Sequence, residues 1–281
     1  QLLASAFDAN QDIPFTDGNF TEVIPKIGVS YRWNEDITAS FILQQGFRSG
    51  GVGVNTAKAT PFQFDPEFTT NYELSLRSIW LDGKLSANAN IFYIDWEEQQ
   101  IDVQLSASSF DVEVFNAGAS TLQGFELELN YQVNSELNFY SSLGQAKSEF
   151  TDFLIVVPTG SDDVVFDLSG RSFADSPEWT ANAGFTYKGD NGVLANASVN
   201  YADSSNTLTN PYSSGLEQGN EGFDLSNDER TLVNMQLGYE WESIGVYLIG
   251  KNILDEQYIE NPNIFTERKI TKQSLSAPRQ F

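Results

Sequence analysis

Apolar and polar residues alternate for about ten positions on both sides of five short turns in this chain. Residues 26–33 illustrate the pattern, because their odd positions are apolar or aromatic and their even positions are polar or small. Successive side chains of a strand point to opposite faces, so each such segment would have one apolar face and one polar face. A tilted strand needs about ten residues to cross a bilayer, and the pattern therefore predicts membrane-spanning β-hairpins.

The turns within these hairpins are short, and the connections between hairpins are long. We place the turns at residues 34–36, 82–84, 134–136, 189–192 and 242–243. We expect the long connections at about residues 49–68, 101–118, 151–177, 206–227 and 255–271. Tight turns at one rim and long loops at the other are typical of bacterial outer-membrane barrels, whose long loops face the exterior. The sequence thus predicts an all-β fold, a transmembrane antiparallel β-barrel with short periplasmic turns and long extracellular loops that carry the function.

Large aromatic residues occur on the apolar faces, most of them beside the short turns. Tyr and Trp rings suit the boundary where hydrocarbon gives way to lipid headgroups. We therefore expect a lipid-facing aromatic girdle made of Tyr31, Trp33, Trp80, Tyr131, Trp179, Tyr187, Tyr239 and Trp241.

Composition excludes several other classes of protein. The mean hydropathy is -0.31, and the chain lacks an uninterrupted apolar run of about 18 residues, which argues against a helical membrane protein. Cys and His are both absent, so disulfides, thiolate metal sites and Ser-His-Asp or Cys-His catalysis are unavailable. We accordingly predict that the chain is not an enzyme and assign it no catalytic residues and no cofactor.

The chain is strongly acidic, with 39 Asp and Glu against 15 Lys and Arg and a formal charge of -24. Such a charge repels phosphates, so we expect no nucleic-acid partner. Acidic residues gather in the long connections, where they form either a solvated rim or a surface that binds cations. Their spacing matches no EF-hand loop, and we assign no metal.

Two carboxylates on one strand raise an alternative. Glu126 and Glu128 would lie about 7 Å apart on the same, lumenal face, a separation that a glycosidase could use. A hydrated barrel wall is the favoured interpretation.

A family resemblance comes from several segments. Residues 64–74, Phe-Asp-Pro-Glu-Phe-Thr-Thr-Asn-Tyr-Glu-Leu, resemble the part of TonB-dependent outer-membrane receptors where a long loop ends in a Pro-Glu pair and a Tyr-Glu strand begins. Four further segments resemble landmarks of the same receptors in order and spacing, namely residues 45–51, 116–128, 251–258 and 277–281. The resemblance covers nearly the whole chain from about Ile24 onward.

The resemblance implies a receptor in the bacterial outer membrane that actively imports a scarce nutrient. Such receptors are barrels of about 22 strands with a plugged lumen. The outer loops and the plug bind the ligand, and an inner-membrane TonB complex acts on a short box ahead of the plug. The segments are most similar to the iron-siderophore branch, so a ferric siderophore is the expected cargo. The alternatives are cobalamin, a saccharide or another substrate, a passive porin, or a soluble β-rich binding module.

The chain departs from the family pattern in its number of strands. We count about eleven strand-like segments, which is half of the family's number, and we find neither a plug nor a TonB box near the start. We therefore expect residues 1–281 to be the C-terminal part of the barrel, with the plug and the N-terminal strands absent from this sequence. The expected partners are outer-membrane lipid, the ferric siderophore or a similar small ligand, and the TonB energy-coupling complex through the absent plug and box.

No ligand-binding motif carries over from the family, because receptor loops diverge with their cargo. An anionic ferric chelate would require Arg or Lys and aromatic faces near the mouth formed by the loops. The residues that meet this requirement are Arg48, Lys58, Phe62, Arg171, Tyr212 and Phe223. The alternative interpretation is that Arg48 and Arg171 pair with carboxylates of the acidic rim.

Overall fold

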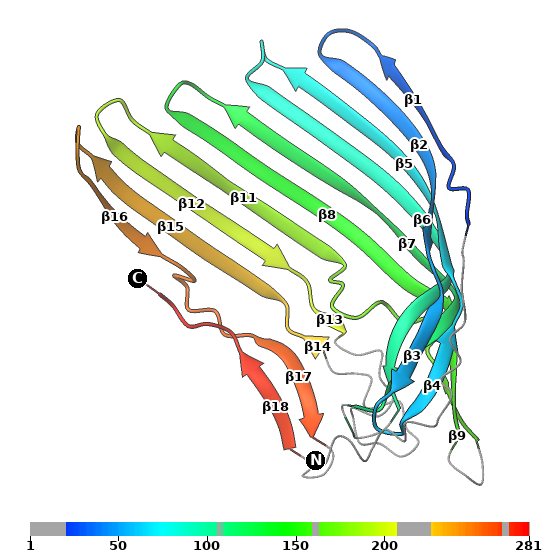
Figure 1. Ribbon diagram of the computed structural model, residues 1–281. Helices are drawn as coiled ribbons and strands as arrows, with labels where there is room; N and C mark the ends of the chain where they lie inside the picture. The colour runs from blue at the N-terminus through cyan, green and yellow to red at the C-terminus, as the bar shows by residue number, and fades with distance from the viewer. Residues whose placement is uncertain are drawn as a thin grey trace.

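The computed structural model describes residues 21–105, 108, 110–158, 163–206, 226–265 and 270–280. These residues form β-strands and no helix (Figure 1). Accordingly, the described part of the chain contains no helix with the length and hydropathy of a membrane span. The all-β prediction is confirmed.

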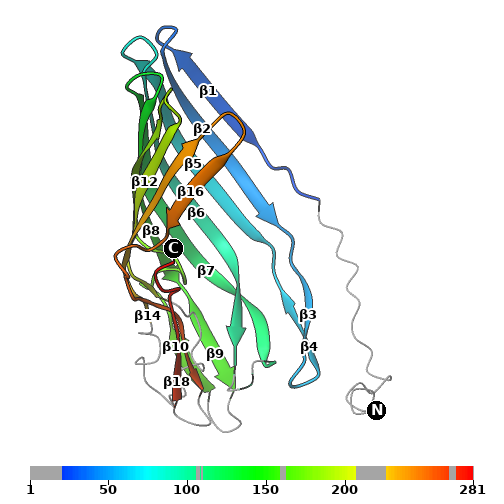
Figure 2. The same ribbon diagram turned by 90° about the vertical axis from the view of Figure 1, so that its left-hand side faces the viewer.

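One large antiparallel sheet organises the molecule. Its ten strands pair in the order in which they occur along the chain, skipping the short strands of the long connections. They are β1 (Lys26–Arg32), β2 (Ile37–Arg48), β5 (Glu67–Trp80), β6 (Leu85–Gln104), β7 (Val112–Gln132), β8 (Leu137–Asp152), β11 (Trp179–Lys188), β12 (Val193–Ala202), β15 (Arg230–Glu240) and β16 (Gly245–Gly250). The sheet curves like a barrel wall but does not close, so β1 and β16 are its edges (Figures 1 and 2).

The five predicted short turns are confirmed, and all lie at one end of the sheet (Figure 1). Asn side chains shape two of them. Asn34 Oδ1 accepts hydrogen bonds from the amides of Asp36 and Ile37 at 2.9 and 2.8 Å, and Asn134 Oδ1 accepts the equivalent pair at 2.9 Å each. An Asn that bonds the backbone two residues ahead favours a tight turn. Another turn uses Gly192 at φ +87°, a conformation that a side chain would disfavour.

The long connections lie at the other end, and they contain short hairpins of their own (Figure 1). The paired strands are β3 (Gly51–Asn55) with β4 (Thr60–Phe64), β9 (Leu154–Pro158) with β10 (Asp163–Asp167), β13 (Ser205–Asn206) with β14 (Ser226–Asn227), and β17 (Ile259–Phe265) with β18 (Ile270–Leu275).

One predicted connection was too long. We expected residues 101–118 to link two strands, but β6 continues to Gln104 and β7 begins at Val112. The ladder extends through the pairs Ile101 with Phe115 and Val103 with Glu113. The extension is stabilised because it contributes apolar side chains to a core at the loop end of the sheet.

This core is small and lies where the ends of β6, β7 and β8 meet the β9–β10 hairpin. Its buried members are Val103, Leu105, Ala117, Phe150, Phe153, Ile155 and Leu168. The rings of Phe150 and Phe173 lie 4.9 Å apart, and those of Trp96 and Phe173 lie 6.1 Å apart. Burial of these rings fixes the connection between β8 and β11 against the sheet, because each aromatic side chain removes a large apolar area from water.

The rest of the sheet exposes its apolar face. The exposed fraction is 62% for Tyr31 and 50% for Leu74, and the alternating residues Leu127 and Phe185 are partly exposed. The apolar residues of the alternating pattern therefore do not lie in a sealed interior such as that of a β-sandwich.

Candidate functional site

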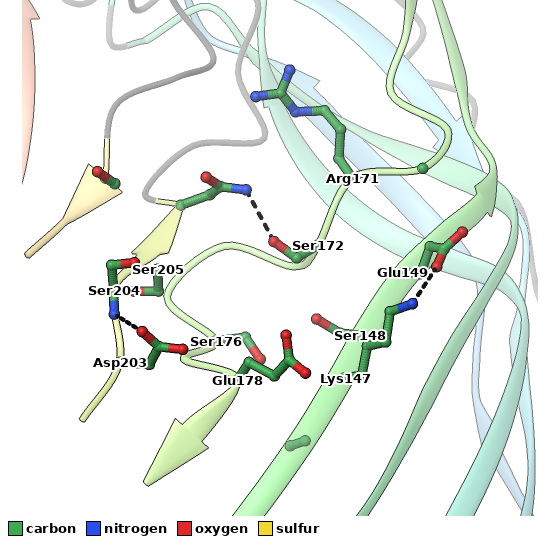
Figure 3. A pocket seen from close by; sticks show the side chains of 14 residues that line it. Lys147, Ser148, Glu149, Arg171, Ser172, Ser176, Glu178, Asp203, Ser204 and Ser205 are labelled. Carbon is green, nitrogen blue, oxygen red and sulfur yellow. Dashed lines mark hydrogen bonds and ion pairs between the residues drawn. The ribbon is translucent and has the colours of Figure 1, made fainter. Parts of the chain in front are cut away.

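A polar cavity of about 560 Å³ lies at the loop end of the sheet (Figure 3). Four parts of the chain surround it: the end of β8, the segment of residues 170–178 that precedes β11, residues 203–206 that follow β12, and Ser226 at the start of β14. The lining residues with polar side chains are Lys147, Ser148, Glu149, Arg171, Ser172, Ser176, Glu178, Asp203, Ser204, Ser205, Asn206 and Ser226.

Backbone hydrogen bonds hold the segment 170–178 beside β8. The amide of Gly170 donates to the carbonyl of Phe150 at 2.7 Å, and the amide of Phe150 donates to the carbonyl of Arg171 at 2.9 Å. Farther along, the amide of Ala146 donates to the carbonyl of Glu178 at 2.9 Å. This wall of the cavity is therefore an extension of the sheet, and the packing of Phe173 on the core anchors it.

The opposite wall is formed by the chain that leaves β12. Asp203 Oδ1 accepts a hydrogen bond from the amide of Ser204 at 2.9 Å, and Asn206 Nδ2 donates to Ser172 Oγ at 2.9 Å across the cavity rim. Figure 3 shows Lys147 and Glu149 on one side of the cavity and Asp203 on the other. Two connections that are distant in the sequence thus meet at one site.

The chemistry of the lining suits reversible binding. Hydroxyl groups both donate and accept hydrogen bonds, and six serines line the cavity. Its two cationic side chains are Lys147, whose Nζ lies 3.5 Å from Glu149 Oε2, and Arg171 on the segment 170–178. The described residues contain no group of three or more His, Cys, Asp or Glu that could hold a metal ion.

Of the four predicted ligand residues that the structure describes, only Arg171 lines this cavity. Arg48 lies at the end of β2, where its Nε is 3.3 Å from Glu67 Oε1 and donates to Gln100 Oε1 at 2.6 Å. Lys58 Nζ lies 3.1 Å from Asp111 Oδ1. Both cations are paired with carboxylates, the arrangement that the alternative interpretation expected for Arg48.

Phe62 is a strand residue of the β3–β4 hairpin. Its ring packs over Gly53, the residue opposite in the register, and lies 6.3 Å from the ring of Phe64. Tyr212 and Phe223, the remaining predicted ligand residues, lie outside the described residues. The structure thus places Arg48, Lys58 and Phe62 in one connection and Arg171 in another.

Sequence reasoning missed the hydroxyl-bearing part of the site. Ser148, Ser172 and Ser204 lie in the cavity, whereas the ligand residues predicted from the sequence were cations and aromatic rings. The density of Ser, Asp and Asn in residues 167–178 and 203–206 was the available signal.

The polar face of the sheet carries a second, smaller hollow of about 170 Å³. It is lined by Glu73, Arg77, Asn88, Glu126 and Glu128 among others. Glu126 and Glu128 thus share one face, as predicted, in a setting with a third carboxylate and a guanidinium.

The predicted girdle residues lie on the apolar face. Seven of the eight are within a few residues of the short turns, and Trp179 begins β11 at the loop end. The rings of Tyr31 and Trp33 lie 5.8 Å apart, and those of Tyr239 and Trp241 lie 4.6 Å apart.

The family model described as TonB dependent receptor-like, beta-barrel, matches residues 4–253. The chain belongs to the TonB-dependent receptor family. Its members are outer-membrane β-barrels that act as receptors and transporters, so the predicted family and the predicted location in the outer membrane are both confirmed.

One curated relative is the probable TonB-dependent siderophore receptor PiuA of Acinetobacter baumannii. It is 27% identical over 159 residues, which cover 56% of this chain and 21% of the relative. Among solved structures, the ferric yersiniabactin uptake receptor FyuA of Yersinia pestis is similar with a TM-score of 0.68, at 16% identity over 90% of this chain and 35% of that chain.

The solved siderophore receptor PiuA of A. baumannii is also similar, with a TM-score of 0.66 and 17% identity over 90% of this chain and 34% of that chain. This receptor chain therefore spans about a third of the length of these structures. At such identities the likeness shows the barrel fold alone.

Proposed function

We propose that this chain forms part of the wall of an outer-membrane receptor that actively imports a ferric siderophore. The observation that carries the proposal is the polar cavity built by two long connections at the loop end of a TonB-dependent receptor barrel. The long loops of such barrels face the exterior, where a scarce nutrient is captured. Siderophore is the preferred cargo because a curated relative is named a siderophore receptor.

In this proposal the apolar face of the sheet contacts lipid. Residues such as Trp33 and Trp241, whose exposed fractions are 75% and 56%, place their rings at the periplasmic headgroup boundary. Trp179 takes the corresponding position at the loop end.

The rest of the wall and a plug complete the receptor. If the edge strands β1 and β16 stood unpaired in lipid, their backbone N–H and C=O groups would lack hydrogen-bond partners. Each such group would cost several kcal/mol of free energy. Further strands that pair with these edges remove this penalty. The inner hollow with Glu73, Arg77 and Glu126 offers charged groups to a protein plug, through which the TonB complex supplies energy.

The ligand enters at the loop end. Arg171 contributes a guanidinium to the cavity, and the neighbouring hydroxyls supply hydrogen bonds. Arg48, Lys58 and Phe62 form part of the entrance on the side of the β2–β5 connection.

Iron-limited growth and uptake of radiolabelled ferric chelates by whole cells test the proposal. Deletion of the complete gene should abolish uptake of at least one chelate, and loss of the inner-membrane energy complex should abolish the same uptake. Arg171→Ala should reduce uptake, whereas Gln63→Ala, on the exposed side of the β3–β4 hairpin, should not. Uptake that continues without the energy complex would refute active import.

A further inference from the structure

Charge is unevenly distributed in the two connections that bound the loop-end cavity. Residues 153–178 contain five acidic residues and one basic residue, and residues 203–229 contain six acidic residues and no Lys or Arg. The acidic residues whose side chains the structure describes are Asp167, Asp175, Glu178, Asp203, Asp228 and Glu229. A ligand that approaches this part of the receptor therefore meets a negative field.

The side chains that line the cavity also carry a net negative charge. Lys147 and Glu149 lie 3.5 Å apart and form a neutral pair. The remaining charged groups of the lining are two carboxylates, those of Glu178 and Asp203, and one guanidinium, that of Arg171, so the net charge of the lining is negative. Uncharged groups hydrogen-bond both carboxylates, because Gln145 Nε2 donates to Glu178 Oε1 at 2.9 Å and the amide of Ser204 donates to Asp203.

Two other cations at the loop end are already matched. Arg48 lies against Glu67, which is 6% exposed, and Lys58 lies against Asp111, which is 4% exposed. A polyanionic ligand that recruited either cation would leave a buried carboxylate without its counter-charge, which is unfavourable. Neither Arg48 nor Lys58 is thus readily available to such a ligand.

The hydroxyls of the cavity favour a different ligand periphery. Ser148, Ser172, Ser176, Ser204 and Ser205 offer both donors and acceptors, and Asn206 adds an amide. These groups match amide carbonyls, hydroxyls and ammonium groups, whereas the many charges of a tris-catecholate require Arg or Lys.

We infer that this cavity selects ferric chelates that are uncharged or cationic, with a periphery rich in carbonyl and hydroxyl oxygen, and that it discriminates against polyanionic chelates. The inference rests on the proposed function, because it names the class of siderophore taken by the same site. Carboxylates act on a chelate within about 8 Å at physiological ionic strength, so the selection operates once the ligand is inside the cavity.

Binding to the full-length receptor tests the inference. A cationic ferric trihydroxamate and a polyanionic ferric tris-catecholate are titrated separately, and quenching of intrinsic Trp fluorescence reports binding. The trihydroxamate should bind more tightly by about tenfold or more, and added salt should narrow the difference because it screens the carboxylates. Tighter binding of the tris-catecholate would overturn the inference.

Isosteric variants locate the source of the selection. The double variant Glu178→Gln with Asp203→Asn keeps both hydrogen bonds but removes two charges, so the preference for the trihydroxamate should fall several-fold. Glu242→Gln, at a short turn on the opposite end of the sheet, removes a charge far from the cavity and should leave the preference unchanged. If the double variant folds to normal levels and its preference for the trihydroxamate is unchanged, the charge selection does not arise from this cavity.

The outcomes separate this inference from the proposed function. If the tris-catecholate is bound and imported in preference, the receptor is a siderophore importer and only the charge selection fails. If cells import neither chelate nor any other ferric chelate through the receptor, the proposed function fails, and the selection fails with it.

Discussion

Asn55 Nδ2 donates a hydrogen bond of 2.6 Å to Asp111 Oδ1, and this contact ties the β3–β4 hairpin to the connection between β6 and β7. The same amide nitrogen also donates to Glu113 Oε1 at 2.8 Å. Asn55 is fully buried, and its Oδ1 accepts the amides of Ala57 and Lys58 at 3.1 Å each. One side chain therefore shapes the hairpin turn and docks it on the neighbouring strands.

Replacement of this amide should loosen the hairpin. In Asn55→Leu, Asp111 and Glu113 lose a buried donor, which costs about 1–3 kcal/mol. We expect trypsin to cleave after Lys58 about tenfold faster in outer-membrane vesicles, because local opening becomes more frequent. Gln63→Leu, an exposed change in the same hairpin, is the control and should cleave at the normal rate. Equal rates in the two variants would show that Asn55 does not dock the hairpin.

The alternation of residues was sufficient to predict the sheet but not the site. It located all five turns, because the two-residue period of a strand and the Asn and Gly of tight turns are local properties. The pairing of Arg48 with Glu67 depends on the register of β2 and β5 across a long connection, which local patterns do not fix. The cavity depends on where Phe173 packs, and that position is set by contacts with Trp96 and Phe150, far away in the sequence.

Gly124 on β7 marks a close approach within the barrel wall. A Cβ at this position would overlap the carbonyl oxygen of Gln145 on β8 and lie 2.9 Å from the ring of Phe92 on β6. Gly124→Ala should therefore destabilise the wall by about 1–3 kcal/mol and lower the amount of folded receptor.

Heat-modifiable migration of the receptor in gels measures the folded fraction in outer membranes. Gly28→Ala on β1 is the matched control, because its nearest non-local atoms would be at an ordinary contact distance of 3.7 Å. If both variants assemble to the same level, the close packing at Gly124 has no influence on assembly.

The β9–β10 hairpin should respond to acid. The hydroxyl and the amide of Ser169 hydrogen-bond the carboxylate of Asp167 and lower its pKa below the ordinary aspartate value. A carboxyl group with a lowered folded-state pKa adds stability above its unfolded pKa and loses that stability as the pH falls through the folded value. The turn after β10 should therefore open more often below about pH 4.

Hydrogen–deuterium exchange of peptides that cover residues 163–170, corrected for intrinsic rates, measures this opening. Asp167→Asn should abolish the increase in exchange at low pH, and Ser169→Ala should make that increase smaller. Asp190→Asn, in a turn at the opposite end of the sheet, should not change the pH dependence of exchange in residues 163–170. An acid response that persists in Asp167→Asn would assign it to another group.

The five Trp residues offer a direct test of which face meets lipid. Trp33 and Trp241 are exposed on the apolar face beside short turns, whereas Trp96 packs against Phe173 and its Nε1 is buried. In vesicles with brominated acyl chains, a full receptor that retains Trp33 as its single Trp should be quenched strongly, because the ring lies at the hydrocarbon boundary. A receptor that retains only Trp96 should be quenched weakly under the same conditions. Equal quenching of the two receptors would contradict the assignment of the apolar face to lipid.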